Sequence, residues 1–224
     1  MVKTLHIYSD FDGTITTQDS LVVLLDRYAD PSWRNLERKI REEGFPEKLA
    51  LPMMMDLVRA EWGEVRDHLL QCIDLDSHFK FFVGWSKLRQ AQLTILSGGF
   101  EEIIKIFLDR EGLSNLNYRA NRLRITGGSW KVFPARGNAL CENQNHCKCG
   151  SMSSDNSGLR VYIGDGHTDF CPAKGADIIF AKAHLLSHAR KLNLHCYEFK
   201  NFEDVQRHLE MILHADGPLK QAQA

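Results

Sequence analysis

Three short apolar runs, each followed by a small polar motif, constrain the fold of this chain more than any other feature. They are Leu5–Phe11 before Asp12-Gly13-Thr14, Leu93–Ser97 before Gly98-Gly99, and Val161–Ile163 before Gly164-Asp165-Gly166. Apolar runs of this length that stop at glycine are typical of buried strands. Between them, segments such as Phe100–Arg110 repeat apolar residues at helical spacing. This alternation predicts an α/β fold in which a Rossmann-like parallel sheet carries helices on both faces.

The segment between the first two strands has no strand pattern. From Asp19 onwards, apolar residues recur at helical spacing, and we expect helices at about 20–28, 31–43, 47–62, 63–72 and 77–89. The charge-rich part of the second helix, at 34–43, is expected to face solvent. We therefore predict an all-helical cap domain at residues 17–90, inserted into a core domain made of residues 1–16 and 91–224.

The second half of the chain returns to strands. Two short runs around Gly127-Gly128 predict a β-hairpin within Tyr118–Phe133. Residues 136–158 are polar and predict an irregular loop. Beyond this loop, strands at 177–180 and 195–199 alternate with helices, which completes the predicted sheet.

Composition excludes several classes of partner. Lysine and arginine number 28 against 29 acidic residues, so the charge predicts no general attraction for nucleic acid or an anionic membrane. No apolar run approaches the ~20 residues of a membrane helix, and the first eight residues lack a signal-peptide pattern. The six cysteines are scattered, which favours reduced thiols and a cytoplasmic protein. The oligomeric state does not follow from the sequence.

Four aspartates follow predicted strands, and they define the expected chemistry. In a parallel sheet the carboxyl ends of the strands share one edge, so Asp10, Asp12, Asp165 and Asp169 are expected to lie close together. Such a cluster is repulsive unless a cation is present, and Mg²⁺ prefers carboxylate oxygens. A carboxylate can also attack a phosphate ester and form an aspartyl-phosphate. The cluster therefore predicts magnesium-dependent phosphoryl transfer.

These motifs resemble those of the haloacid dehalogenase (HAD) superfamily over essentially the full length. The resemblance consists of Asp-Phe-Asp-Gly-Thr at 10–14, the strand-terminal Ser97, a lysine, and Gly-Asp-Gly-x-x-Asp at 164–169, in this order. The helical insertion is similar to that of the phosphoserine phosphatase branch. The Phe-Cys-Pro that follows Asp169 is similar to methionine-salvage and phosphocholine phosphatase-like relatives. The resemblance implies a phosphatase that hydrolyses a small phosphate ester.

The resemblance also implies a role for each aspartate. Asp10 is expected to be the nucleophile and a metal ligand. Asp12 is expected to protonate the leaving oxygen, to activate water afterwards, and to give its backbone carbonyl to the metal. Asp165 would be the remaining carboxylate ligand, and Asp169 would steady the water shell of the metal.

By the same resemblance, several residues would hold the phosphate. Thr14, Ser97 and the amide of Gly98 would bind its oxygens. Lys148 follows Asn-His-Cys and matches an asparagine-x-cysteine-lysine pattern, although the usual next glycine is displaced by one position. Lys131 is a weaker alternative.

Asp19 lies nine positions after the nucleophile, where phosphoserine phosphatases carry an acidic residue that binds the substrate. We expect Asp19 to contact the substrate, with 2-hydroxy-3-keto-5-methylthiopentenyl-1-phosphate as first candidate and phosphoserine as second. Phosphocholine would require an aromatic cage, for which Trp33, Trp62 and Trp85 are available. The methionines at Met53–Met55 are compatible with a thioether pocket or with ordinary packing.

Other interpretations are weaker. Four residues of the polar loop could bind zinc: Cys141, His146, Cys147 and Cys149. Structural zinc sites usually show two ligand pairs at regular spacing, so ordinary loop thiols are favoured. His184 and His188 are four residues apart without a third ligand, which favours a solvated helix face. A phosphomutase, or a catalytically silent binding module, is the remaining functional alternative.

Overall fold

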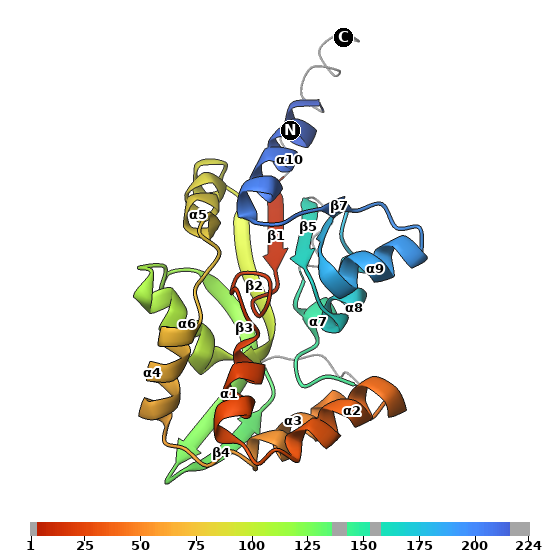
Figure 1. The fold of residues 1–224 in the computed structure, drawn as a ribbon. Coiled ribbons are helices and arrows are strands. Elements are labelled where there is room, and N and C mark those ends of the chain that lie inside the picture. Colours follow the sequence, from red (N-terminus) through yellow and green to blue (C-terminus); the bar gives the residue numbers. More distant parts are fainter. Residues whose placement is uncertain (1–3, 136–142, 153–157, 216–224) are drawn as a thin grey trace, which may run out of the picture.

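A seven-stranded sheet, in the order β4-β3-β2-β1-β5-β6-β7, forms the centre of the molecule (Figure 1). The computed structural model describes residues 4–135, 143–152 and 158–215. Neighbouring strands are parallel except β3 and β4, which are antiparallel. The strands are β1 (Leu5–Ser9), β2 (Gln92–Phe100), β3 (Asn117–Thr126), β4 (Ser129–Phe133), β5 (Leu159–Gly164), β6 (Ile178–Ala181) and β7 (Tyr197–Glu198).

Helices occupy most of the remaining described chain. Five precede β2: α1 (Ser20–Tyr28), α2 (Trp33–Glu43), α3 (Glu47–Met55), α4 (Trp62–Cys72) and α5 (Phe79–Leu88). The others are α6 (Glu101–Arg110), α7 (Lys148–Ser151), the 3₁₀ helix η1 (His167–Asp169), α8 (Phe170–Lys174), α9 (Ala183–Lys191) and α10 (Phe202–Ala215). No helix in the described ranges is long and apolar enough to span a membrane.

Successive strand residues point to opposite faces of the sheet, and each face buries its own apolar cluster. Ile7 and Ile163 belong to a large cluster that includes residues of α5, α6 and α10. Tyr8 and Tyr162, their neighbours in sequence, belong to a smaller cluster with residues of α8 and α9. Because strand side chains alternate with a period of two, both faces must be covered. The predicted α/β fold with helices on both faces is confirmed.

The helical segment between β1 and β2 begins at the carboxyl end of β1. Figure 1 shows α1, α2 and α3 beyond the arrowhead of β1, beside β4. Tertiary contacts end the third helix earlier than predicted. It stops at Met55 rather than near residue 62, because Val58 forms a bridge with Ala29 and the carbonyl of Ala60 accepts a hydrogen bond from Trp130 Nε1 at 2.9 Å.

The hairpin prediction is confirmed, whereas the loop prediction is only partly tested. Gly127 and Gly128 both have positive φ, as a two-residue turn between β3 and β4 requires. Within the predicted loop, residues 136–142 and 153–157 lie outside the described residues. Lys148–Ser151 forms the helix α7, so the prediction of irregular structure is wrong there.

Candidate active site

The three polar motifs lie at the carboxyl ends of three adjacent strands. Asp10 follows β1, Ser97 lies in β2, and Asp165 follows β5, on either side of β1 in the sheet. The amide of Asp10 donates to the carbonyl of Ile163 at 2.8 Å, so the first motif is tied directly to the neighbouring strand. Ligands bind at this edge in parallel α/β sheets.

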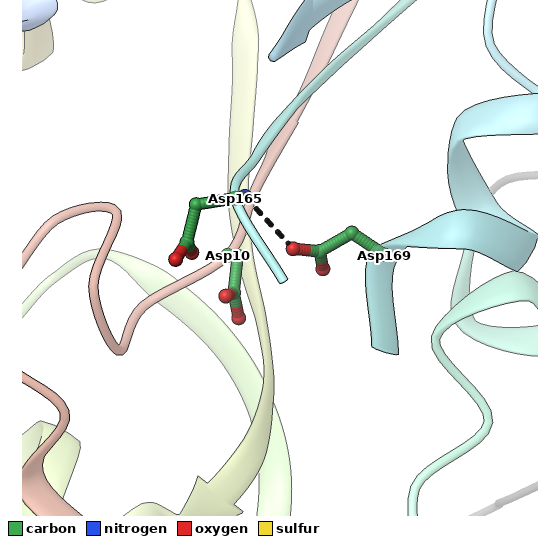
Figure 2. A group of neighbouring side chains, drawn as sticks. All are labelled: Asp10, Asp165 and Asp169. Carbon is green, nitrogen blue, oxygen red and sulfur yellow. Dashed lines mark hydrogen bonds between the residues drawn. The ribbon is translucent and has the colours of Figure 1, made fainter. Parts of the chain in front are cut away.

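Asp10, Asp165 and Asp169 form a compact group of carboxylates (Figure 2). One oxygen from each lies within 4.8 Å of the others. Burial, and then the charge of Asp169, raise the pKa of Asp10 well above its ordinary value. Burial also raises the pKa of Asp165. A divalent cation would offset this concentration of negative charge, and oxygen donors of this kind suit Mg²⁺.

Lys148 enters this group from α7. Its Nζ donates to Asp10 Oδ1 at 2.6 Å and to Asp169 Oδ1 at 2.8 Å, and the side chain is only 1% exposed. Burial by itself lowers the pKa of Lys148, but the charges of Asp10 and Asp169 outweigh it and raise the pKa. Lys131 instead forms an exposed ion pair with Asp56. The structure therefore brings Lys148, and not Lys131, to the predicted nucleophile.

Asp169 holds several neighbours at once. Its Oδ1 accepts from the hydroxyl of Tyr162 at 2.6 Å as well as from Lys148, and its Oδ2 accepts from the amides of Asp165 and Gly166. These bonds fix the loop that carries Asp165. Tyr162 could not be recognised from the sequence, because a tyrosine inside an apolar run has the pattern of an ordinary core residue.

Asp12 lies at the start of the helical segment. Its Oδ1 accepts from both the amide and the hydroxyl of Ser20, and Ser97 donates to its Oδ2 at 3.4 Å. Burial first, and then the charge of Asp19, raise the pKa of Asp12 to about 7. Both protonation states are therefore populated near neutral pH.

Two glycines of the motifs, Gly13 and Gly164, allow the backbone to lie close to the carboxylates of Asp165 and Asp169. Gly13 has a φ of +75°, and a Cβ there would lie 2.8 Å from Asp165 Oδ2. At Gly164 a Cβ would lie 2.6 Å from Asp169 Oδ2. Thr14, predicted to bind phosphate, donates its hydroxyl to Asp165 Oδ1 at 2.8 Å. In this structure Thr14 orients a carboxylate, and its contact with phosphate stays a prediction.

Side chains from other elements form hydrogen bonds with the backbone of the serine-glycine segment of β2. His146 Nδ1 donates to the carbonyl of Ser97 at 2.7 Å, and its Nε2 pairs with the hydroxyl of Ser151 at 2.8 Å. Burial lowers the pKa of His146 to about 4, so its ring is neutral. Asn121 Nδ2 donates to the carbonyl of Gly98 at 2.8 Å. Neither role was visible in the sequence.

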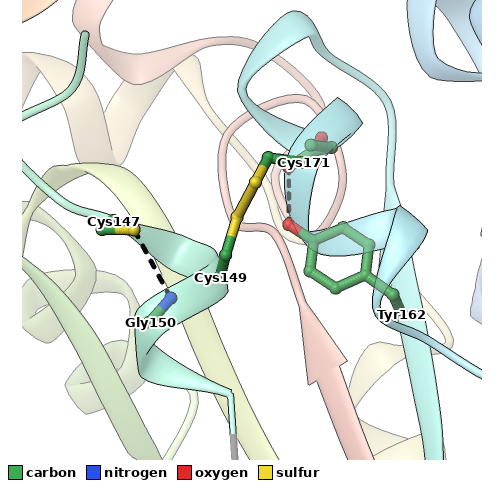
Figure 3. Close-up of a disulfide and its surroundings, with 6 residues drawn as sticks. Cys147, Cys149, Gly150, Tyr162 and Cys171 are labelled. Atoms are coloured by element: carbon green, nitrogen blue, oxygen red, sulfur yellow. Dashed lines mark hydrogen bonds between the residues drawn. A yellow bond between two sulfur atoms is a disulfide. The ribbon is translucent and has the colours of Figure 1, made fainter. Parts of the chain in front are cut away.

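The structure bears on two predictions for the cysteine-rich loop, the zinc site and the reduced thiols. Cys141 lies outside the described residues, and both nitrogens of His146 are used in hydrogen bonds, which leaves no zinc set there among the described residues. Cys149 forms a disulfide with Cys171 across α7 and α8 (Figure 3). The expectation of reduced thiols is wrong for this pair, which is 22 residues apart in sequence and becomes adjacent only through packing.

A pocket opens in front of the carboxylates. Beyond Asp10, Asp12 and Asp165, its walls include Asp19, Leu21, Arg41, Glu47, His167 and His184. Asp19 is also the N-cap of α1, since its Oδ1 accepts from the amide of Val22 at 3.0 Å. Desolvation raises the pKa of Asp19, although the side chain reaches solvent through the pocket.

The residues proposed for an aromatic cage or a thioether pocket do not line this pocket. Trp33 and Trp85 are buried, and Trp62 packs edge-on against Trp130 with ring centroids 6.0 Å apart. Of the methionines, those at 54 and 55 belong to the core and the one at 53 is half exposed. His184 does line the pocket, so the expectation of a merely solvated face is incomplete.

Comparison with known protein families identifies the family of this chain. The family model for haloacid dehalogenase-like hydrolases matches residues 7–174. The chain belongs to the haloacid dehalogenase-like hydrolase family. The predictions of a family hydrolase and of an enzyme of the phosphatase class are confirmed.

Relatives of this HAD hydrolase extend along almost its entire length. The 2-hydroxy-3-keto-5-methylthiopentenyl-1-phosphate phosphatase of Geobacillus thermodenitrificans is 31% identical, covering 95% of this chain and 98% of its own. Pdp3-interacting factor 1 of Schizosaccharomyces pombe is 26% identical, covering 94% of this chain and 96% of its own. A substrate-bound phosphoserine phosphatase structure superposes with a TM-score of 0.68 at 19% identity, covering 93% of this chain and 99% of that one, which shows a shared fold.

Proposed function

We propose that this HAD hydrolase is a magnesium-dependent phosphomonoesterase that cleaves a small phosphate ester through an aspartyl-phosphate on Asp10. One observation carries the proposal. Asp10 and Asp12 both line the pocket, and the buried Lys148 bonds Asp10 at 2.6 Å. A nucleophile, an acid and a fixed cation are the protein groups that transfer of a phosphoryl group requires.

In the first half-reaction, a carboxylate oxygen of Asp10 attacks phosphorus. The bond from phosphorus to the ester oxygen breaks, and its electron pair stays on that oxygen. Asp12 gives its proton to the departing oxygen, a role that its pKa of about 7 supports. Lys148 offsets negative charge beside the new aspartyl-phosphate.

In the second half-reaction, Asp12 accepts a proton from water. The oxygen of that water attacks phosphorus, the acyl-phosphate bond breaks, and the carboxylate of Asp10 is regenerated as inorganic phosphate leaves. Ser97 and the amide of Gly98 are proposed to donate hydrogen bonds to the phosphoryl oxygens during both steps. The hydroxyl of Ser97 already lies 3.4 Å from Asp12 Oδ2.

The carboxylates fit a magnesium ion. Asp10, Asp165 and the backbone carbonyl of Asp12 would hold Mg²⁺, and Asp169 would act from behind them, because its oxygens already accept bonds from Lys148, Tyr162 and two amides. The bound ion supplies positive charge to the phosphoryl oxygens. The pKa values of Asp10 and Asp165 are raised first by burial and then by neighbouring carboxylates, and a bound cation would favour the charged form of both groups.

The first substrate candidate is 2-hydroxy-3-keto-5-methylthiopentenyl-1-phosphate, which names the activity of the Geobacillus relative at 31% identity. Phosphoserine is the second candidate, supported by the acidic Asp19 in the pocket wall. Phosphocholine is less favoured, because no tryptophan, tyrosine or phenylalanine is among the described residues that line the pocket.

The test is release of inorganic phosphate from p-nitrophenyl phosphate, with Mg²⁺ and with a chelator, in wild type and Asp10→Asn. We expect activity in wild type with Mg²⁺, and none with the chelator or in Asp10→Asn. Acid quenching of wild type during turnover should add one phosphoryl group to the peptide that contains Asp10. Asp56→Asn, at an exposed ion pair, is the matched control. Phosphorylation of Asp10 without phosphate release would indicate a phosphomutase. The absence of both phosphorylation and phosphate release would indicate a silent binding module.

A further inference from the structure

Three basic side chains line the pocket beyond the reacting carboxylates. His167 lies in η1, directly after the Gly-Asp-Gly turn, and His184 lies in α9. Arg41 reaches the same pocket from α2, in the inserted helical segment. The chemistry proposed above uses none of the three.

Ring stacking holds the two histidines in place. The rings of His167 and His184 are stacked with centroids 4.7 Å apart, and Phe170 meets His167 edge-on at 5.0 Å. The ring of His188 is parallel to that of Phe170, with the two centroids 3.6 Å apart. Three successive contacts among four rings therefore restrict the imidazoles of His167 and His184.

The backbone before His184 is strained in a way that serves the same placement. Ala183 has a φ of +45°, a left-handed conformation that costs free energy for a residue with a Cβ. The amide of Leu185, the residue after His184, donates to the carbonyl of Asp165 at 2.8 Å. The strained turn thus ties the start of α9, and with it His184, to the loop of the catalytic edge.

The remaining walls carry acidic groups and little apolar surface. Glu47 Oε1 lies 3.7 Å from the place that a Cβ on Gly98 would take, so this carboxylate borders the phosphate end of the pocket. Asp19 lies in the same wall, and Leu21 is the one large apolar side chain among the described lining residues. A purely alkyl leaving group would desolvate these charges without replacing their hydrogen bonds, which is unfavourable.

We infer that Arg41, His167 and His184 form a subsite that binds acceptor oxygens of the leaving group, while Asp19 and Glu47 accept from its hydroxyls. The inference rests on the proposed phosphatase function and names its substrate class, which is a phosphate ester whose leaving group carries a hydroxyl beside a carbonyl or carboxylate. A hydroxy-keto chain and a hydroxy-acid share this chemistry. The three basic residues are specificity-determining and take no part in bond breaking.

The experiment compares three esters: 3-phosphoglycerate, which has a hydroxyl and a carboxylate, the methylthiopentenyl phosphate, which has a hydroxyl and a keto group, and n-butyl phosphate, which has neither. We measure kcat/KM in wild type, Arg41→Ala and His184→Ala. The matched controls are Arg38→Ala, in the same helix α2 as Arg41, and His195→Ala. Neither residue lines the pocket. The same esters are titrated into Asp10→Asn, with and without the two changes, to measure Kd without turnover.

Wild type should prefer at least one oxygenated ester over n-butyl phosphate by about 10–100-fold, the effect of one hydrogen bond to a charged group. Arg41→Ala and His184→Ala should each reduce that preference about tenfold, through KM and Kd, and the controls should keep it. The ester with the larger loss in Arg41→Ala identifies the carboxylate or the keto group as the natural partner.

An equal response of all three esters to both changes would overturn the subsite, as would a wild type that does not discriminate among them. Failure of the phosphatase function is a separate outcome. In that case no ester is hydrolysed, yet the preference in Kd persists in Asp10→Asn and still supports the subsite.

Discussion

The edge of the sheet and the helical wall of the pocket are built differently. At the edge, Asp10, Asp169 and Lys148 have at most 5% of their surface exposed, and each bonds directly to another member of the group. On the wall, Arg41 and Asp19 are exposed. Arg41 pairs with Glu37 of its own helix, four residues earlier.

This difference is consistent with the proposal that bond breaking takes place at the edge of the sheet and substrate selection at the helical wall. Buried charges are tolerated when they are paired, so removal of Lys148 would take away the cation that pairs with both Asp10 and Asp169. Exposed charges on a helix are solvated and individually contribute little to stability. Substitutions in the helical wall can therefore alter substrate choice at little cost in stability, whereas the residues of the edge depend on one another. The separation of bond breaking from substrate selection can be tested by substitution, hydrogen exchange and thermal denaturation.

Asp10→Asn should abolish turnover, because the amide cannot attack phosphorus. Folding should be preserved or strengthened, since burial raises the pKa of Asp10 and its charge therefore opposes folding at neutral pH. Phosphate release and thermal denaturation measure the two effects. Activity in the purified variant above about a tenth of wild type would mean that another residue is the nucleophile.

Asp12→Asn should lower kcat by about 10²–10⁴-fold and leave Mg²⁺ affinity nearly unchanged. The amide loses the acid and base function, whereas the backbone carbonyl remains. Asp165→Ala is the contrasting variant, in which metal affinity should fail first. Magnesium titrations of activity distinguish them, and a large loss of affinity in Asp12→Asn at an intact maximal rate contradicts the assignment.

The helical segment from about Asp19 to Arg89 should close over the bound phosphate. Its first helix begins at the catalytic edge, and closure would exclude water from the first half-reaction. Amide hydrogen exchange with beryllium fluoride and Mg²⁺ should slow in α1–α3 more than in α9 or α10. An unchanged exchange pattern in α1–α3 would show that the wall does not move.

Stability without metal should fall as pH rises. Asp10, Asp12 and Asp165 all have raised pKa values in the folded state, so they contribute most when protonated, and the contribution of Asp12 is lost between about pH 4 and pH 7. With a chelator, Tm should be several degrees higher at about pH 5 than at about pH 8, since 1 kcal/mol corresponds to about 2–4 °C. Mg²⁺ should reduce the difference, and a Tm that rises with pH in chelator would refute the argument.

The smallest effect is expected at Asp19, which lines the pocket and also caps α1. Asp19→Ala removes the N-cap of α1 and should destabilise the protein by ~1 kcal/mol, whereas Asp19→Asn keeps the cap and removes the charge. We expect both variants to lower kcat/KM for the methylthiopentenyl phosphate and phosphoserine by about tenfold relative to phosphocholine. If Asp19→Asn matches wild type on all three, Asp19 is only a cap.

Local patterns in the sequence were enough to predict the sheet, the helical insertion and the clustering of the aspartates. Asp10, Asp12 and Asp165 follow apolar runs, and the direction of a parallel strand decides at which edge its last residues emerge. The turn at Gly127-Gly128 was equally local, because positive φ favours glycine. Such features depend on a few neighbouring residues and can be derived from their pattern.

Which distant groups meet depends on packing and could not be predicted from the sequence. Lys148 and Lys131 were both compatible with the sequence, and packing of α7 against the sheet buries the first beside Asp10. Tyr162 had the pattern of an ordinary core residue, and Arg41 that of an exposed helix face. Their partners lie in other elements, and a periodic pattern reports which face of an element is apolar but not what that face will touch.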